Sequence, residues 1–183
     1  MITITDHQKQ IITSVKKWIN DVVIGLNFCP FAKKEVSRDT IRYYVSDDIN
    51  EKSALDIVIN ELANLDNSDK IQTTLIIFSK GFSDFETYLD LVDRANQLIE
   101  QGGYSGLYQL ATFHPEYYFD GEDVNDAANY TNRSPYPILH LLREASLEQV
   151  LKNYPNPENI PDDNITKARE LGVNYFKKQL QIK

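Results

Sequence analysis

The chain has 183 residues, of which 42% are hydrophobic and 25% are charged, values typical of a folded globular protein rather than a disordered one. Its 27 acidic residues outnumber its 19 basic residues, and the resulting net charge of −8 would repel a polyanion, so we expect no nucleic-acid partner. No apolar run is long enough to cross a bilayer, so we expect no membrane partner either.

A chain of this length fits one domain, and we expect residues 1–183 to share a single core. Residues 1–8 lack the charged start and apolar centre of a secretion signal. Cys29 is the only cysteine, which excludes an internal disulfide and agrees with a reducing compartment. We therefore expect a cytoplasmic protein.

The first third of the chain alternates between helical and strand patterns. Apolar positions at helical spacing predict a helix over residues 6–24. An apolar turn over 25–32 follows, and Pro30 keeps it from continuing the helix smoothly. A β-branched and aromatic run predicts a strand over 40–45, and a second amphipathic pattern predicts a helix over 55–65.

The middle of the chain repeats this alternation. Residues 73–78 form a nearly continuous apolar run, the pattern of a strand covered on both faces. Ser83 opens a capping-box sequence, which predicts the start of a third helix that ends near residues 102–103. Residues 107–113 predict a third strand.

The last third begins with a polar, acidic connection over residues 116–126, and a loop of this length in a small domain is more often functional than idle. Helices are predicted over 137–152 and 162–178, because the prolines in 153–157 break the pattern between them. The whole order favours an α/β fold: a single domain with a small, predominantly parallel or mixed sheet of about three strands, flanked by about five helices.

His114 follows the third predicted strand, at the edge of the sheet where α/β proteins bind ligands. A neutral imidazole offers one donor and one acceptor near physiological pH, so His114 is a candidate general base or metal ligand. The alternative is a histidine that caps the strand by hydrogen bonding.

His140, Arg143 and Glu144 fall at helical spacings, which would place His140 and Glu144 on one helix face. Such a pair suits a shared metal ion, or a histidine whose tautomer the carboxylate fixes. Ordinary helix surfaces produce the same spacing, so a purely structural pair is the alternative.

Asn129, Asn132, Arg133 and Ser134 precede that predicted helix and could hold a carboxylate or phosphate through a guanidinium fork and side-chain amides. Pro135 and other prolines here remove backbone donors, so side chains would carry the binding. The alternative is a structural turn in which Arg133 bonds carbonyl oxygens.

Cys29 is a candidate nucleophile if a helix end or a histidine lowers the pKa of its thiol. Its aromatic neighbours Phe28 and Phe31 favour burial, in which case the thiol is inert. Tyr136 belongs to an aromatic group that either lines a ligand pocket or packs in the core. The other members are Tyr117, Tyr118, Phe119 and Tyr130.

Three segments of the chain resemble the bacterial protein family named domain of unknown function 1415. They are Trp18 and Ile19 with residues 22–32, then residues 113–115, then residues 129–144. The resemblance runs over nearly the whole domain. It implies no catalytic residue, cofactor or substrate.

The leading hypothesis is an enzyme, a hydrolase or group transferase, that acts on a small anionic metabolite at a site built from residues 114–144. Arg133 and Asn132 would orient the ligand, and His114 or His140 would move a proton. Hydride chemistry is disfavoured because no Gly-rich dinucleotide fingerprint is present.

Two other hypotheses stay open. One is a non-catalytic protein-binding or adaptor domain, in which the polar segment is a rigid turn and the acidic loop contacts another protein. The other is a metal-dependent hydrolase that uses His114, His140 and Glu144 with an acid such as Asp120.

Overall fold

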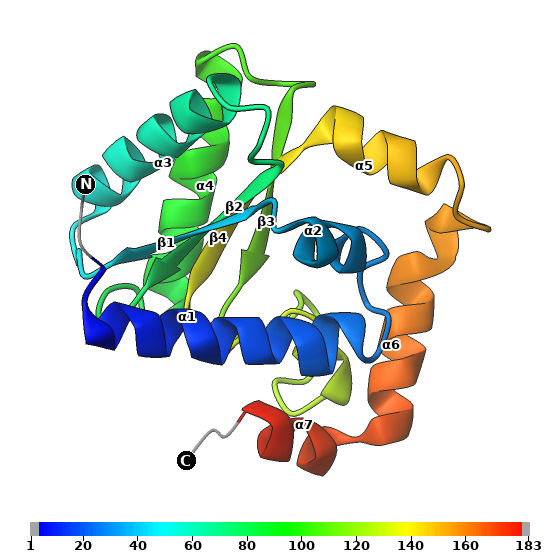
Figure 1. The fold of residues 1–183 in the computed structure, drawn as a ribbon. Coiled ribbons are helices and arrows are strands. Elements are labelled where there is room, and N and C mark those ends of the chain that lie inside the picture. The colour runs from blue at the N-terminus through cyan, green and yellow to red at the C-terminus, as the bar shows by residue number, and fades with distance from the viewer. Residues whose placement is uncertain (1–3, 181–183) are drawn as a thin grey trace.

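Four strands form one mixed sheet through the centre of the molecule, in the order β1-β2-β4-β3 (Figure 1). The computed structural model describes residues 4–180, so the first residues of the segment compared with a secretion signal lie outside it. β1 (Ile41–Ser46) is parallel to β2 (Thr73–Phe78). β4 (Ile138–Arg143) is antiparallel to both β2 and β3 (Tyr108–Phe113). The α/β class with a mixed sheet is confirmed.

β4 occupies a region where the sequence indicates a helix. The prediction of one helix over residues 137–152 is wrong, because only α5 (Glu144–Leu151) is helical there. Ile138 and Leu139 are both fully buried, on opposite faces of the sheet, since helices cover β4 on each side. A central strand of this kind is apolar without alternation, and hydrophobic spacing does not distinguish it from a buried helix. The sheet therefore has four strands rather than about three.

Two long helices, α3 (Glu51–Asp66) and α4 (Phe85–Gln101), cover one face of the sheet (Figure 1). Their apolar stripes pack on the strands because an amphipathic helix must bury that stripe. We call this layer the α3/α4 core. Its buried members include Val58, Leu62, Ile76, Leu91, Leu139 and Leu141.

The boundaries of α4 follow from its capping residues. Asp84, rather than the expected Ser83, is the N-cap, and its Oδ1 atom accepts the N–H of Thr87 at 2.8 Å. The helix ends at Gln101 and Gly102 follows as its C-cap, which confirms the predicted end.

The opposite face of the sheet is covered by α1 (Asp6–Trp18), which continues as a π-helix (Ile19–Ile24). The C-terminal helices α6 (Ile160–Leu171) and α7 (Val173–Leu180) pack on the 3₁₀-helix Ala127–Thr131 and contribute Ala168 and Phe176 to the core on this face. The short α2 (Ala32–Arg38) lies beside them (Figure 1). We call the layer between these helices and the sheet the α1 core. Its buried members include Val15, Trp18, Leu75, Ile138, Ala168 and Phe176.

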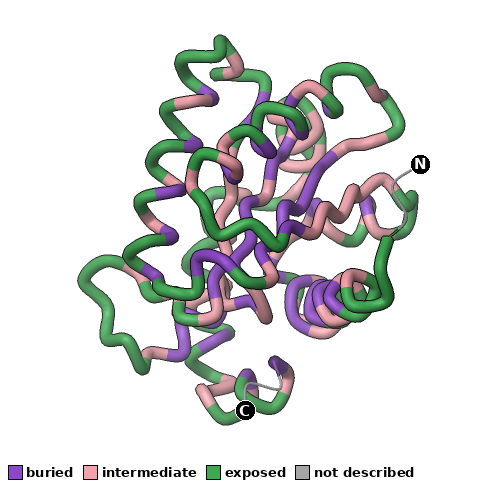
Figure 2. The backbone as a smooth tube through the Cα atoms, turned by 90° about the vertical axis from the view of Figure 1, so that its left-hand side faces the viewer, coloured by how far each residue is buried: buried purple, intermediate pink, exposed green. Residues whose placement is uncertain are grey.

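Burial follows this layering, because buried residues (purple in Figure 2) lie along the strands and on the inner sides of the helices. Seven α-helices occur within residues 4–180, against about five expected. One addition arises because Gly172, at a φ of 75°, divides the helix predicted over 162–178 into α6 and α7. In the described part of the chain, no helix has the length and apolar character needed to span a membrane.

Candidate functional site

His114 is fully buried at the end of β3, on the α3/α4 side of the sheet. Its Nδ1 atom accepts the N–H of Glu116 at 3.0 Å, so Nε2 carries the proton and donates it to the carbonyl oxygen of Phe82 at 2.9 Å. The rings of Phe85 and Tyr88 lie 5.1 and 5.0 Å away. Burial lowers the pKa of His114, and both of its nitrogens are occupied. These contacts match the capping alternative.

Arg133 is bound to backbone carbonyl groups. Its Nε atom donates to the oxygen of Tyr117 at 2.9 Å, and Nη2 donates to that of Val124 at 2.8 Å. The guanidinium carbon also lies 4.6 Å from the centre of the Tyr130 ring. Arg133 therefore fastens the acidic connection to the following turn, as the structural alternative expects.

Asn129 and Ser134 form part of the same turn and are both fully buried. The Asn129 side chain accepts the N–H of Phe119 at 3.1 Å and donates to the oxygen of Asp123 at 2.9 Å. The Ser134 hydroxyl donates to the oxygen of Tyr136 at 2.5 Å. Each of these polar side chains is used to hold its own chain.

The acidic connection is tied to α6. Arg169 pairs with Glu122 at 3.0 Å and with Asp126 at 2.9 Å. Two carboxylates of the loop thus have partners within the chain, so less of its charge is available to another molecule.

The aromatic group near this turn is divided between the two cores. The rings of Tyr117 and Tyr118 pack on Phe85, at 5.5 and 5.0 Å, whereas Tyr130 stacks on Phe176 at 4.9 Å. Tyr136 packs against the α1 core. Most of these aromatic side chains thus pack in the cores, which is the alternative to lining a ligand pocket.

Arg143 and Glu144 do not form a helical cluster with His140, so that expectation is wrong. Because residue 140 lies in β4, the helical spacing does not apply. Arg143 donates to the hydroxyl of Tyr108 at 3.0 Å and to the oxygen of Ser68 at 3.2 Å. Glu144 starts α5, where its N–H donates to the oxygen of Leu107 at 3.0 Å.

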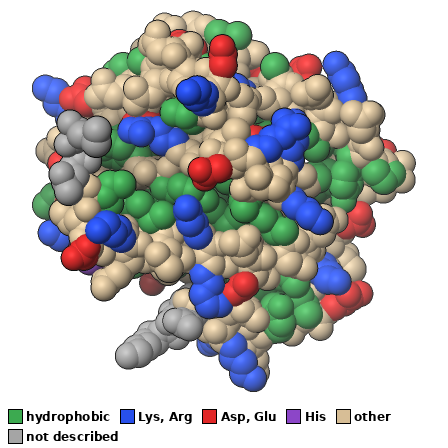
Figure 3. Space-filling view, in the orientation of Figure 1, with side chains coloured by type: hydrophobic (Ala, Val, Ile, Leu, Met, Phe, Trp, Pro, Cys, Tyr) green, Lys and Arg blue, Asp and Glu red, His purple; other side chains and the backbone are tan. Residues whose placement is uncertain are grey.

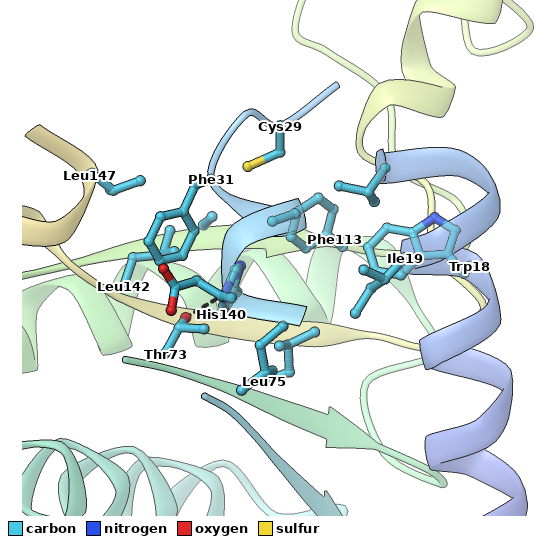
Figure 4. A pocket seen from close by; sticks show the side chains of 15 residues that line it. Trp18, Ile19, Cys29, Phe31, Thr73, Leu75, Phe113, His140, Leu142 and Leu147 are labelled. Atoms are coloured by element: carbon cyan, nitrogen blue, oxygen red, sulfur yellow. Dashed lines mark hydrogen bonds between the residues drawn. The ribbon is translucent and has the colours of Figure 1, made fainter. Parts of the chain in front are cut away.

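His140 and Cys29, by contrast, line the same cavity. This inner cavity has a volume of about 100 Å³ and lies between the sheet and the helices α1 and α2 (Figure 4). On the corresponding face of the molecule, hydrophobic side chains gather where α1 passes in front of the sheet (Figure 3). The lining residues that matter for its chemistry are Trp18, Cys29, Phe31, Glu35, Phe113 and His140.

The neighbours of His140 fix its tautomer. The Thr73 hydroxyl oxygen lies 2.6 Å from Nε2 of His140 and 2.6 Å from the carbonyl oxygen of Leu141. A hydroxyl has one hydrogen, which goes to the carbonyl, so Nε2–H of His140 donates to Thr73. Nδ1 is then an acceptor, and it has no hydrogen-bond partner among residues 4–180. Burial lowers the pKa of His140 to about 4, so the imidazole is neutral at physiological pH.

Cys29 lies in the loop before α2, and its sulfur faces the cavity (Figure 4). Burial raises the pKa of the Cys29 thiol, and the backbone N–H groups of Ala32 and Phe31 oppose this change only in part. The thiol is therefore protonated at neutral pH, and it would need a base to become a nucleophile. His140, which lines the same cavity, is a neutral base.

Glu35, which was not among the expected site residues, also lines the inner cavity. It is only 1% exposed, and Thr40 donates a hydrogen bond to its Oε2 atom. Its Oε1 atom has no hydrogen-bond partner within the described chain. The signal for Glu35 is its spacing from Phe31, since four residues bring both onto one face of a helix.

A second hollow of about 300 Å³ adjoins the inner cavity, and we call it the outer hollow. The two share Val23, Cys29 and Phe113 in their linings. Asn132, one of the predicted ligand residues, lines the outer hollow and donates to the oxygen of Thr112 at 3.2 Å. Asn132 thus comes near Cys29, whereas Arg133 does not join either lining.

His114 and His140 do not converge, because the first packs in the α3/α4 core and the second lines a cavity on the α1 side. Across residues 4–180, no three His, Cys, Asp or Glu side chains gather as a protein-bound metal ion would require. The predicted metal set of His114, His140 and Glu144 is not assembled.

Comparison with known proteins gives one match. No curated protein and no solved structure matches the chain. A family model described as "Protein of unknown function (DUF1415)" matches residues 10–178, which include most of α1, the whole sheet and the inner-cavity residues Trp18, Cys29, Phe31, Glu35, Phe113 and His140. The chain therefore belongs to the DUF1415 family.

Proposed function

We propose that this protein binds a small, largely apolar molecule in the inner cavity and that His140 receives a hydrogen bond from it. The fixed tautomer of His140 carries this proposal. The Thr73 hydroxyl accepts a hydrogen bond from Nε2–H, so Nδ1 keeps an unused lone pair, and His140 lines a cavity whose other walls are mostly apolar. An acceptor held in this way would select a ligand that brings a donor.

Two isomeric probes test this proposal. 1-Butanol carries a hydrogen-bond donor, whereas diethyl ether has the same atoms and no donor. We expect 1-butanol to shift the methyl NMR signals of Leu75, Leu142 and Leu147, which line the cavity, and diethyl ether to shift them more weakly. In His140→Phe the difference between the isomers should disappear, while in His7→Phe, at an exposed position, it should persist. If neither isomer moves these signals in the wild-type protein, the proposal fails.

A second candidate is a hydrolase or group transferase in which Cys29 is the nucleophile. It is favoured by the position of the thiol and the neutral imidazole on one cavity. The Cys29 proton would pass to Nδ1 of His140 while the sulfur adds to a carbonyl carbon. The leaving group would then take that proton, and water would hydrolyse the thioester to free acid and thiol.

This candidate predicts that p-nitrophenyl butyrate acylates Cys29 and that mass spectrometry detects the acyl group. His140→Gln should slow the acylation, and Cys29→Ser should abolish thioester formation. An unmodified wild-type thiol after long incubation would argue against it. The anionic metabolite of the leading hypothesis has less support, because within residues 4–180 no Lys or Arg lines the inner cavity or the outer hollow.

A further inference from the structure

We infer that the ligand of the inner cavity is a small organic cation, an aliphatic amine in its ammonium form, an inference that rests on the proposed function. It begins from Glu35. This carboxylate is 1% exposed and contributes to the cavity lining, and its Oε1 atom has no hydrogen-bond partner within residues 4–180. A buried carboxylate oxygen is costly without a partner, and a ligand cation would supply one.

The nearby cations leave this oxygen available. The Nζ atom of Lys34 lies 3.9 Å from Oε1 of Glu35, beyond hydrogen-bonding distance, and the Lys34 side chain is 31% exposed. Lys16 lines a small hollow on another side of Glu35, but its ammonium group lies 5.0 Å from the centre of the Tyr43 ring. Oε1 of Glu35, a residue of the cavity lining, thus receives a hydrogen bond from neither cation.

The polar groups that face the cavity call for a ligand that donates. Oε1 of Glu35 accepts, and Nδ1 of His140 accepts because of its tautomer. A carboxylate or phosphate ligand would bring further acceptors, and no Lys or Arg of the described chain lines the cavity to donate to them. An ammonium group brings three donors and a positive charge, which match both acceptors.

Aromatic rings add a second reason to expect a cation. Trp18, Phe31 and Phe113 all belong to the cavity lining. The faces of such rings attract cations, most strongly when water is excluded. The net charge of −8 also raises the concentration of cations near the molecule.

Cavity size limits the rest of the ligand. A dry apolar cavity of about 150 Å³ accommodates benzene, and the inner cavity measures about 100 Å³. The apolar part of the ligand should therefore be a short aliphatic chain, smaller than a benzene ring. n-Butylamine combines such a chain with an ammonium group that, like the lysine side chain, is protonated at pH 7.

The test compares n-butylamine, 1-butanol and butyrate on the wild-type protein, with dissociation constants from titration of the cavity methyl signals. We expect butylamine to bind at least about tenfold more tightly than 1-butanol, and butyrate to bind most weakly. If 1-butanol binds as tightly as butylamine, or if butyrate binds more tightly than butylamine, the inference is overturned while the proposed function stands. If none of the three binds, the proposed function falls as well.

Three variants test whether the preference for butylamine arises at Glu35. Glu35→Gln should lower the affinity for butylamine at least about tenfold and change the affinity for 1-butanol by less than about threefold. Glu148→Gln, at an exposed position on α5, is the matched control and should leave both affinities unchanged. Lys34→Gln should strengthen butylamine binding, because it removes the cation nearest to Oε1. Equal butylamine affinities in Glu35→Gln and wild type would contradict the inference, and the wild-type comparison decides it if Glu35→Gln does not fold.

Discussion

The Oγ1 atom of Thr73 lies 2.6 Å from Nε2 of His140, across the antiparallel pair of β2 and β4. The same hydroxyl donates to the carbonyl oxygen of Leu141, so it must accept from the imidazole. A single β-strand hydroxyl thus fixes the tautomer of His140 and leaves Nδ1 as a hydrogen-bond acceptor. The availability of Nδ1, on which the proposed binding mode depends, follows from this contact.

Replacement of Thr73 by Val should release that constraint. Valine has a similar shape but no hydroxyl, so Nε2–H of His140 and the oxygen of Leu141 both lose a partner. We expect a loss of about 1–3 kcal/mol in the free energy of unfolding, measured in urea, and a weaker preference for 1-butanol over diethyl ether. In ¹⁵N NMR spectra, the wild type should show His140 protonated at Nε2.

Thr73→Ser is the matched control because it keeps the hydroxyl. It should preserve both the tautomer and the preference for 1-butanol, with a smaller loss of stability than Val. A Thr73→Val protein whose His140 signals match those of wild type would show that another group fixes the ring.

Much of the fold could be read from local patterns. The short run at Thr73–Phe78 is rich in β-branched residues, which favours a strand, and the amphipathic stripe of α4 has the period of a helix. β4 could not be read in the same way, because its apolar run lacks alternation, is rich in leucine and continues without a break into α5. Because β4 was expected to be part of a helix, His140 and Glu144 were wrongly expected to lie on one helix face.

The candidate site was harder to predict, because its members come together only through the sheet. Cys29 and His140 were both named from the sequence, yet nothing in their spacing indicates that they share a cavity. Glu35 and Thr73 were missed because each lies in an ordinary element and gains its role from burial. Arg133 showed the reverse case: a conspicuous residue whose bonds to carbonyl oxygens depend on a turn that local sequence does not reveal.

His114→Leu should destabilise the protein without affecting the inner cavity. The change leaves the Phe82 oxygen and the Glu116 N–H without their partner. We expect a loss of about 2–4 kcal/mol in the free energy of unfolding. The affinity for 1-butanol, measured at a temperature at which the variant is folded, should stay within about twofold of the wild-type value. His7→Leu, at an exposed position, controls for the loss of an imidazole, and a His114→Leu variant that keeps its stability but loses binding would assign His114 to the site.

Arg133→Met should likewise lower the stability of the protein without affecting binding in the inner cavity. Methionine keeps much of the side-chain length but cannot donate to the oxygens of Tyr117 and Val124. We expect the free energy of unfolding, measured in urea, to fall by about 1.5–3 kcal/mol, because hydrogen bonds donated by charged groups are stronger than those between neutral groups. Arg38→Met, at an exposed position, should change stability by less than about 0.5 kcal/mol. Reduced affinity for butyrate in Arg133→Met would instead support the anion-binding role.

Alkylation reports directly on Cys29, because it is the only thiol in the chain. Burial raises the pKa of this thiol, so its reaction with iodoacetamide at pH 7.5 should be slower than that of free cysteine and should accelerate as the pH passes 9. Saturating n-butylamine should slow it further, because the ligand would occupy the cavity that the sulfur faces. A rate already at its plateau near pH 7 would mean that Cys29 is a thiolate.

The stability of the protein should fall in acid partly because of His140. Its pKa is about 4 in the folded protein, whereas the ordinary value is 6.5. Between these values the unfolded chain binds more protons, so the free energy of unfolding decreases as the pH drops from 6.5 to 4. The contribution is at most about 3 kcal/mol, from 1.36 kcal/mol per pKa unit. In His140→Gln this part of the pH dependence should vanish, whereas in His7→Gln it should remain. Parallel curves for His140→Gln and wild type would show that the imidazole is not held neutral by burial.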